Sequence, residues 1–264
     1  MGELDGVRAV VTGATSGLGA AMATALLEAG AQVALAARAT ARLETAVAEQ
    51  CAAGWRAEAL PLDVRDPDAV DAAAAGLLRR WGGCDLLVNN AGIGMRTVNE
   101  RFLDEPLPFY AVSPEGFFDV IATNLTGYFL VARAFAPAMV AARRGRIVNV
   151  TMNTATMRRR GFVPYGPSRA GAESLSWIMT EDLAPFGVTV NQLLPGGGTA
   201  TGMIPAADGL RRPELLDPGI MGPPIVFLAS AAAAGITGER IVAKDFAAWR
   251  AARAAMGDGS PADR

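Results

Sequence analysis

The chain of 264 residues contains no histidine at all. Histidine is the usual general base of serine and cysteine hydrolases and the commonest metal ligand in proteins. Its absence excludes Ser-His-Asp chemistry, Cys-His chemistry and histidine-ligated metal sites. Acid–base work therefore falls to tyrosine, lysine, aspartate, glutamate or a bound water, and we expect no metal.

Cysteine is also scarce, because only Cys51 and Cys84 are present and their spacing does not fit a metal site. They are typical of the reduced thiols of a cytoplasmic protein. The first strand begins within a few residues of Met1, so we expect no signal peptide. We also expect no apolar run of membrane-spanning length and hence no membrane partner.

The chain has no large excess of charge of either sign, since the net charge is -2 and the pI is about 5.4. The one basic block is Arg158–Arg160, so we expect no nucleic acid partner. That block is either a solvated loop face or a contact for an anionic substrate. Hydrophobic residues make up 51% of the chain, which favours one α/β domain with a large core.

Residues 7–19 carry the strongest pattern in the chain. Val7–Val11 is typical of a buried parallel strand, and a helical pattern runs from Leu18 to about Ala29. Gly13, Gly17 and Gly19 punctuate the turn between them. Glycines let the backbone approach an anion, and a helix N-terminus offers free N–H donors. We interpret the stretch as a phosphate-binding turn; the alternative is an ordinary tight βα turn.

The segment Thr12–Gly19, with spacing Gly-x-x-x-Gly-x-Gly, resembles the cofactor signature of the short-chain dehydrogenase/reductase family. Asn89–Gly92, which reads Asn-Asn-Ala-Gly, resembles the second signature of that family. The resemblance covers about residues 5–245. It implies a Rossmann-like, doubly wound, seven-stranded parallel sheet in a single α/β domain over residues 1–246. A small substrate lid is expected at about 199–219, and a frayed tail at 247–264.

The residue after the second predicted strand, Gln32–Ala37, indicates the cofactor. An acidic side chain here holds the ribose 2′-hydroxyl of NAD in dinucleotide folds, whereas this chain has Arg38. Arginine pairs with a 2′-phosphate, so we predict NADP(H). The alternative is a surface arginine that caps the strand. Asp63 is expected near the adenine, or else as a cap for the helix that begins at Pro67.

The family resemblance implies a set of cofactor-binding positions spread over the carboxyl ends of the strands. The positions are Gly13, Thr15, Ser16, Gly17, Leu18, Gly19, Arg38, Asp63, Val64, Asn90, Ala91, Gly92, Tyr165, Arg169, Pro195, Gly196 and Thr201.

The resemblance also implies the catalytic residues. Tyr165 matches the tyrosine that exchanges a proton with the substrate oxygen, and Asn124 matches an asparagine that holds a relay water. Arg169 stands at the position of a lysine that, in this family, lowers the pKa of the tyrosine and binds the nicotinamide ribose. Arginine keeps the charge and the donors but does not readily release a proton. Met152 stands at the serine position and donates no useful hydrogen bond. The residue that takes over the hydrogen bond of the serine is left open among Thr151, Asn153 and Thr154.

Three functions follow from this combination. The first is an NADP(H)-dependent oxidoreductase that reduces a carbonyl or oxidises an alcohol. The second is a non-redox enzyme such as a dehydratase, isomerase or cyclase, which uses Tyr165 while the cofactor is structural or absent. The third, a non-catalytic binding protein, is disfavoured by the intact cofactor signatures.

The substrate and the assembly are predicted only in outline. A long loop over residues 93–113 contains Phe102–Tyr110, which with Phe162 favours a hydrophobic small-molecule substrate. The resemblance implies a homodimer or homotetramer formed through helices near 114–142 and 165–186.

Overall fold

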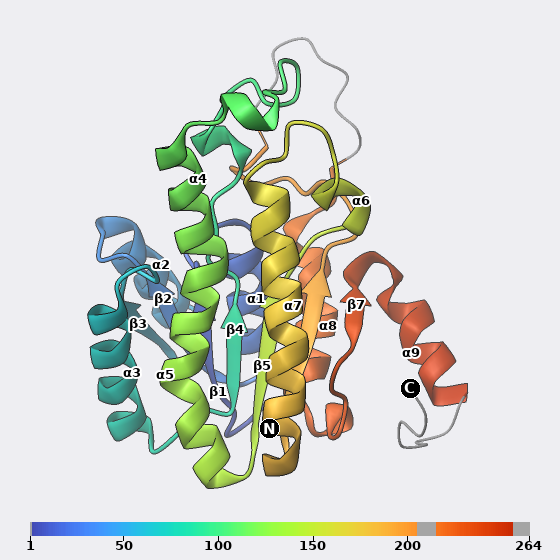
Figure 1. Ribbon diagram of the computed structural model, residues 1–264. Helices are drawn as coiled ribbons and strands as arrows, with labels where there is room; N and C mark the ends of the chain where they lie inside the picture. Colours follow the sequence, from blue (N-terminus) through green and yellow to red (C-terminus); the bar gives the residue numbers. More distant parts are fainter. Residues whose placement is uncertain (1, 205–214, 256–264) are drawn as a thin grey trace.

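A parallel sheet with strand order β3-β2-β1-β4-β5-β6-β7 forms the centre of the protein (Figure 1). This computed structural model describes residues 2–204 and 215–255. The chain starts in the middle of the sheet, builds outward to β3, and then crosses over to build from β4 to β7. The predicted doubly wound, seven-stranded fold is therefore confirmed. The strands are β1 (Arg8–Thr12), β2 (Gln32–Ala37), β3 (Ala57–Pro61), β4 (Leu86–Asn89), β5 (Gly145–Val150), β6 (Val188–Leu194) and β7 (Arg240–Val242).

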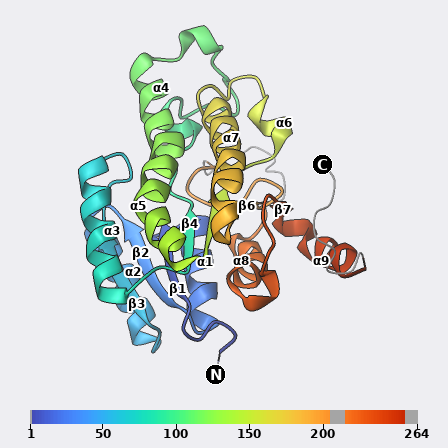
Figure 2. The same ribbon diagram turned by 60° about the horizontal axis from the view of Figure 1, so that its bottom comes forward.

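Helices cover both faces of this sheet (Figures 1 and 2). One face packs against α1 and α8, and the other against α3, α5 and α7. The helices are α1 (Gly17–Glu28), α2 (Ala41–Ala52), α3 (Pro67–Trp81), α4 (Pro114–Ile121), α5 (Gly127–Ala142), α6 (Thr154–Met157), α7 (Tyr165–Leu183), α8 (Gly222–Ala229) and α9 (Phe246–Ala255).

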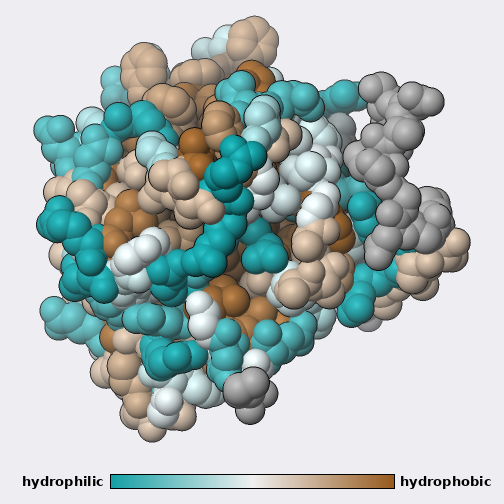
Figure 3. Space-filling view, turned by 90° about the horizontal axis from the view of Figure 1, so that it is seen from below, coloured by the Kyte–Doolittle hydropathy of each residue, from teal (hydrophilic) through white to brown (hydrophobic). Residues whose placement is uncertain are grey.

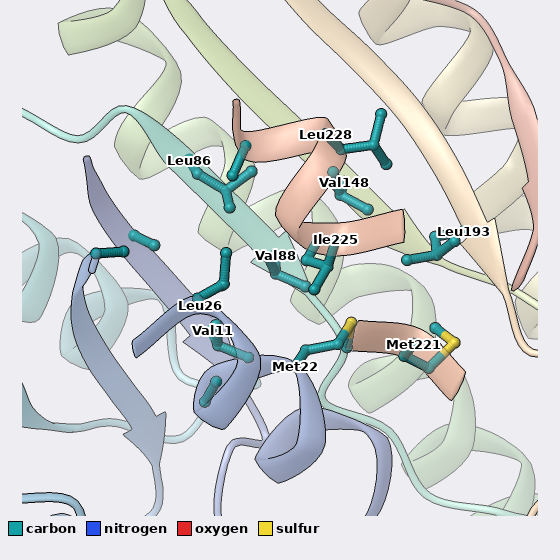
Figure 4. Packing of buried hydrophobic residues seen from close by; sticks show 14 of the residues in the cluster. Val11, Met22, Leu26, Leu86, Val88, Val148, Leu193, Met221, Ile225 and Leu228 are labelled. Carbon is teal, nitrogen blue, oxygen red and sulfur yellow. The ribbon is translucent and has the colours of Figure 1, made fainter. Parts of the chain in front are cut away.

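The central strands are apolar on both sides, as expected of a parallel sheet between two helical layers. In β1, Val10 and Val11 point to opposite faces and both are fully buried. Side chains of β1, β4, β5 and β6 meet those of α1, α8 and the turn before α8 in one cluster (Figure 4). The residues labelled there are Val11, Met22, Leu26, Leu86, Val88, Val148, Leu193, Met221, Ile225 and Leu228.

The helix predicted over 114–142 is interrupted. A π-helical segment, Ala122–Thr126, lies between α4 and α5 and contains Asn124. By length and composition alone, Pro114–Ala142 passes as a membrane span, contrary to the expectation that no run is long enough. In the structure, however, the apolar side chains Val131 and Phe135 are buried against the sheet, which accounts for this composition.

One further prediction differs from the structure at the carboxyl-terminal end, and a second is not tested. The segment expected as a frayed tail from residue 247 forms α9 as far as Ala255. Its first residue, Phe246, and Trp249 pack their rings against Phe227 of α8, with centroids 5.6 and 6.0 Å away. Of the expected lid, residues 205–214 lie outside the described residues; Thr199 and Leu216 on either side form a parallel bridge.

The amino ends of β1 and β4 are joined by an ion pair between Arg8 Nε and Asp85 Oδ2 at 2.7 Å. Figure 3 shows the molecule from this end, where hydrophilic side chains are interspersed with smaller hydrophobic areas. The predicted site residues lie at the opposite end, where the strands terminate. This is where ligands bind in open parallel sheets.

Candidate active site

The turn between β1 and α1 has the geometry of a cradle for an anion. Gly13 and Gly17 have positive φ angles of 66° and 56°. A Cβ on Gly19 would lie 2.3 Å from the carbonyl oxygen of Gly13, so only glycine fits. Within the described residues, Ser16 makes no side-chain capping bond to α1. The first N–H groups of the helix are thus open to a ligand.

The two signature segments are tied together by hydrogen bonds. Thr12 Oγ1 accepts bonds from the backbone N–H groups of Asn90 and Ala91, at 2.9 and 3.0 Å. Asn90 Nδ2 in turn donates to the carbonyl oxygen of Thr12 at 2.9 Å. A Cβ on Gly13 would lie 2.8 Å from Ala91 Cα. The structure therefore brings these predicted positions side by side, through Thr12, the first residue of the signature segment.

Arg38 and Asp63 follow β2 and β3 at the same edge of the sheet. Arg38 is exposed. Hydrogen bonds from Arg65, the closest at 2.8 Å, hold the pKa of Asp63 below its usual range, and the charge of Arg38 contributes. The alternative interpretation of Asp63 as a helix cap is wrong, because Asp66 accepts the bonds from the first turn of α3.

The segment after β6 lies against the glycine turn. Gly196 has a φ of 97°, and the carbonyl oxygen of Pro195 accepts a bond from the backbone of Lys244 at 3.2 Å. A Cβ on Gly17 would lie 3.1 Å from Thr201 Cγ2. Thr201 thus lies against the glycine turn, as the predicted cofactor contacts require.

Tyr165 is the first residue of α7 and is half-buried. Its ring packs in a small apolar cluster beside Met152, Phe102 and Phe162. Among the described residues, the contact found for its hydroxyl is Met203 Sδ at 4.0 Å. Sulfur is a weak acceptor, so the phenolic proton is free for another partner.

Arg169 lies one turn further along α7 and is only 3% exposed. Its Cζ lies 5.3 Å from the ring centroid of Tyr165 and 5.5 Å from that of Tyr128. Burial lowers the pKa of Arg169, but the two phenols outweigh burial and raise it above its ordinary value. The guanidinium therefore stays charged beside the predicted catalytic tyrosine.

Tyr128, a buried residue of α5, was missed by sequence reasoning. Its hydroxyl accepts a bond from Arg169 Nη1 at 2.7 Å and donates to the carbonyl oxygen of Val150 at 3.0 Å. Burial raises the pKa of Tyr128, so it remains a neutral phenol. Its position four residues after Asn124 was the available signal, because residues at that spacing share a helix face.

The side chain of Asn124 is fully buried and joins two segments of the site. Its Oδ1 accepts from the backbone N–H of Ile93, and its Nδ2 donates to the carbonyl oxygen of Ile93, both at 2.9 Å. Nδ2 also lies 3.2 Å from Ser168 Oγ in α7. The amide thus holds the exit of β4 against α7, and its part in a water relay stays a prediction.

A model of the short chain dehydrogenase family matches residues 8–208. The chain belongs to this family. Over 254 residues it is 33% identical to 3-oxoacyl-[acyl-carrier-protein] reductase FabG of Vibrio cholerae, covering 90% of this chain and 96% of the relative. It is 35% identical to gluconate 5-dehydrogenase of Gluconobacter oxydans over 194 residues, or 74% of this chain and 72% of that one. The prediction of an enzyme of the short-chain dehydrogenase family is thus confirmed.

Solved structures of other short-chain dehydrogenases have the same fold. A metagenomic short-chain oxidoreductase in complex with NADP is 33% identical, with a TM-score of 0.76 over 91% of this chain and 97% of that one. A gluconate 5-dehydrogenase from Burkholderia cenocepacia in complex with NADP and tartrate is 28% identical. Its TM-score is 0.81 over 93% of this chain and 96% of that one.

Within this short-chain dehydrogenase, the loop after β5 carries Met152 at the predicted serine position. Thr151 Oγ1 donates to Glu173 Oε1 at 2.7 Å, and Arg240 Nε donates to the same oxygen at 3.0 Å. Arg240 Nη2 also donates to the carbonyl oxygen of Met152 at 2.6 Å. In this arrangement the hydroxyl proton of Thr151 is given to Glu173, and the interpretation of Thr151 as a donor to the substrate stays a prediction.

Asn153 and Thr154 are the other predicted alternatives. Asn153 precedes α6 without a side-chain capping bond among the described residues, and Thr154 is exposed. Asn153 as a donor to the substrate stays a prediction. The other predicted cofactor positions line the same strand ends, in the β1–α1 turn, after β3 and after β4: Thr15, Ser16, Leu18, Val64 and Gly92.

Proposed function

We propose that this protein is an NADP(H)-dependent oxidoreductase that reduces a carbonyl, or oxidises an alcohol, on a hydrophobic small molecule. The observation that carries the proposal is the pairing of Tyr165, whose hydroxyl has a weak sulfur contact at 4.0 Å, with the charged guanidinium of Arg169 beside its ring. Tyr165 lies on the helix that also places the charged Arg169, at the edge of the sheet where the glycine turn opens.

The residues present fit a nicotinamide dinucleotide. The glycine turn leaves no room for a Cβ at Gly19, and the uncapped N-terminus of α1 suits a pyrophosphate. Arg38 stands after β2, where a 2′-phosphate would be recognised, and this favours NADP(H) over NAD(H). Two structurally similar relatives were solved in complex with NADP.

The chemistry assigned to this chain's own residues is a proton transfer. The nicotinamide cofactor supplies or accepts the hydride when it is bound. Tyr165 Oη donates a proton to the carbonyl oxygen during reduction and accepts one from the alcohol during oxidation. Arg169 keeps a positive charge 5.3 Å from the Tyr165 ring, which stabilises negative charge that develops there.

The side chains around Tyr165 support an apolar substrate. Met95, Phe102 and Phe162 are buried in one cluster, against which Met152 packs. Methionine and aromatic side chains offer an adaptable apolar surface. A methionine in place of serine leaves Tyr165, with Asn153 as the predicted second donor, to orient the substrate oxygen.

We also propose a cytoplasmic homo-oligomer. Apolar side chains on α4, α5 and α7 are exposed, with exposed fractions of 68% for Phe118, 46% for Phe129, 45% for Trp177 and 56% for Ile178. These helices stand next to each other on one side of the sheet (Figure 1). Exposed apolar side chains on neighbouring helices favour an interaction face, so a second copy of the chain is the expected partner.

The second candidate is a non-redox reaction such as a dehydration, isomerisation or cyclisation. Met152 and Arg169 favour it, because one removes a hydrogen-bond donor and the other does not readily release a proton. Tyr165 would then act as acid or base without net oxidation of the substrate.

One experiment separates the two candidates. The purified protein is titrated with NADPH and with NADH, and a panel of apolar ketones is then screened by nicotinamide absorbance. The proposal expects NADPH binding and ketone-dependent oxidation that Tyr165→Phe abolishes while NADPH binding persists. Conversion detected by mass without turnover of the nicotinamide would instead support the second candidate.

A further inference from the structure

The guanidinium of Arg169 is a buried charge without a carboxylate partner among the described residues. Removing an ion from water costs free energy that partners within the protein must offset. The partners found here are two phenol rings, the hydroxyl of Tyr128 and one carbonyl oxygen. Arg169 Nε has no hydrogen-bond acceptor in the described structure, so the placement of the group depends on the remaining contacts.

Those contacts form a closed triangle around Arg169 Nη1. This atom donates to Tyr128 Oη at 2.7 Å and to the carbonyl oxygen of Val150 at 3.0 Å. Tyr128 Oη donates to the same carbonyl oxygen at 3.0 Å. The hydroxyl of Tyr128 therefore uses one lone pair and its proton to fix one end of the guanidinium.

The other end of the guanidinium is thereby fixed at Gly92. A Cβ on Gly92 would lie 2.4 Å from Arg169 Nη2, so this nitrogen occupies the space beside the glycine. A guanidinium is planar and rigid, so holding Nη1 also sets the direction of Nη2. Gly92 ends the Asn-Asn-Ala-Gly segment, next to the glycine turn.

We propose that Tyr128 is the positioning residue for Arg169, and that the two side chains together replace a single lysine in holding the nicotinamide ribose. Because the side chain of Tyr128 is only 2% exposed and its hydroxyl is bonded to Arg169, its effect on a bound ribose would pass through Arg169. Tyr128 acts by keeping Nη2 at the Gly92 edge. This inference rests on the proposed NADP(H) function.

The test compares NADPH affinity in two variants that lose equivalent hydroxyl groups. Tyr128→Phe removes a buried hydroxyl that accepts one bond and donates another. The matched control is Ser176→Ala on α7, whose hydroxyl accepts from Asn149 at 2.8 Å and donates to the carbonyl oxygen of Ala172 at 2.7 Å. We expect the Kd for NADPH to be about tenfold higher in Tyr128→Phe, which corresponds to the loss of one hydrogen bond to a charged group. Ser176→Ala should bind as the parent does.

A double variant shows whether Tyr128 works through Arg169. Arg169→Met removes the guanidinium at nearly constant length. In that background Tyr128→Phe should cause no further loss of NADPH affinity, since there is nothing left to position. A further tenfold loss, or an equal loss in Ser176→Ala, would overturn the proposal.

A spectroscopic readout keeps this test independent of the proposed function. In protein labelled with ¹⁵N-arginine, the side-chain signals of Arg169 are identified by their absence from Arg169→Met. Slowly exchanging Nη protons are expected in the parent and in Ser176→Ala, and their loss is expected in Tyr128→Phe. If the parent binds neither NADPH nor NADH, the proposed function fails, and these signals alone decide whether Tyr128 positions Arg169. Unchanged Nη signals in Tyr128→Phe refute the positioning role whatever the protein binds.

Discussion

Replacement of Arg38 tests the cofactor preference most directly. Arg38 is exposed after β2, close enough to Asp63 for its charge to help lower the pKa of that carboxyl group. Arg65 pairs with Asp63 at 2.8 Å, so it is already engaged. Arg38 is therefore the cation at this edge that the proposal assigns to a 2′-phosphate.

The magnitude follows from one charge-assisted contact. A hydrogen bond to a charged group contributes about 1.5–3 kcal/mol, which corresponds to roughly a 10- to 150-fold change in Kd. Arg38→Asp also places a carboxylate where the 2′-phosphate would lie, so the loss of NADPH affinity should reach at least the upper part of this range. NADH affinity should stay constant or improve, because a carboxylate accepts a bond from a ribose 2′-hydroxyl.

The assay is a calorimetric titration of each variant with both nucleotides. Arg79→Asp is the control, since it makes the same change in charge near the end of α3, at the amino edge of the sheet. Its affinities should match those of the parent. Equal losses for NADPH and NADH in Arg38→Asp, or a loss of the same size in Arg79→Asp, would refute the assignment of Arg38 to the phosphate.

Three further perturbations test the cradle, the core and the ion pair. Gly19→Ala should abolish nucleotide binding in a calorimetric titration, because its Cβ would lie 2.3 Å from the backbone oxygen of Gly13; retained affinity would contradict the cradle. Phe135→Ala should lower the free energy of unfolding by about 3–5 kcal/mol in a urea titration, since this ring is fully buried; a loss below about 1 kcal/mol would contradict that packing. Burial raises the pKa of Asp85, but hydrogen bonds and charge from Arg8 outweigh it, so the pKa lies below its ordinary value. This stabilisation is present above the unfolded pKa of about 3.9 and is lost as pH falls through the folded pKa. The Tm of Asp85→Asn should therefore lie below that of the parent at pH 7, and the two Tm values should converge as the pH falls below about 4. A difference in Tm that does not change with pH would contradict this.

Local signals located several elements closely. The helix predicted to begin at Pro67 does begin there, as α3. Asp66 caps its start, proline occupies its first turn, and Gly82 ends it in a left-handed conformation with φ of 71°. Each signal acts within one turn of the chain, so each can be recognised without knowledge of the fold.

Elements that depend on distant contacts were harder to predict. The helical pattern of 114–142 gave no sign of the π-helical segment around Asn124, whose amide reaches Ile93 and Ser168. The segment of helix α9 was expected to be frayed because the chain after it ends in glycine, serine, proline and aspartate, yet Trp249 packs on Phe227 of α8. Both features depend on residues far away in sequence.

In the candidate active site, too, motifs predicted local features but not contacts between distant elements. Motif spacing correctly brought the glycine turn and the Asn-Asn-Ala-Gly segment together, because both follow neighbouring strands. It did not show that the hydroxyl of Thr151 is engaged by Glu173 and Arg240. Glu173 lies on α7 and Arg240 on β7, so their meeting at the β5 loop requires the folded sheet.

The two departures from the family pattern have different physical consequences. Met152 replaces a donor by an apolar group and packs into a cluster that already contains Phe102 and Phe162, so it needs no compensating partner. Arg169 introduces a large buried cation, which must find acceptors inside the protein. Tyr128 supplies one of them at 2.7 Å. A change at position 169 therefore cannot be interpreted alone: the site has to be compared with its relatives as the pair of positions 128 and 169.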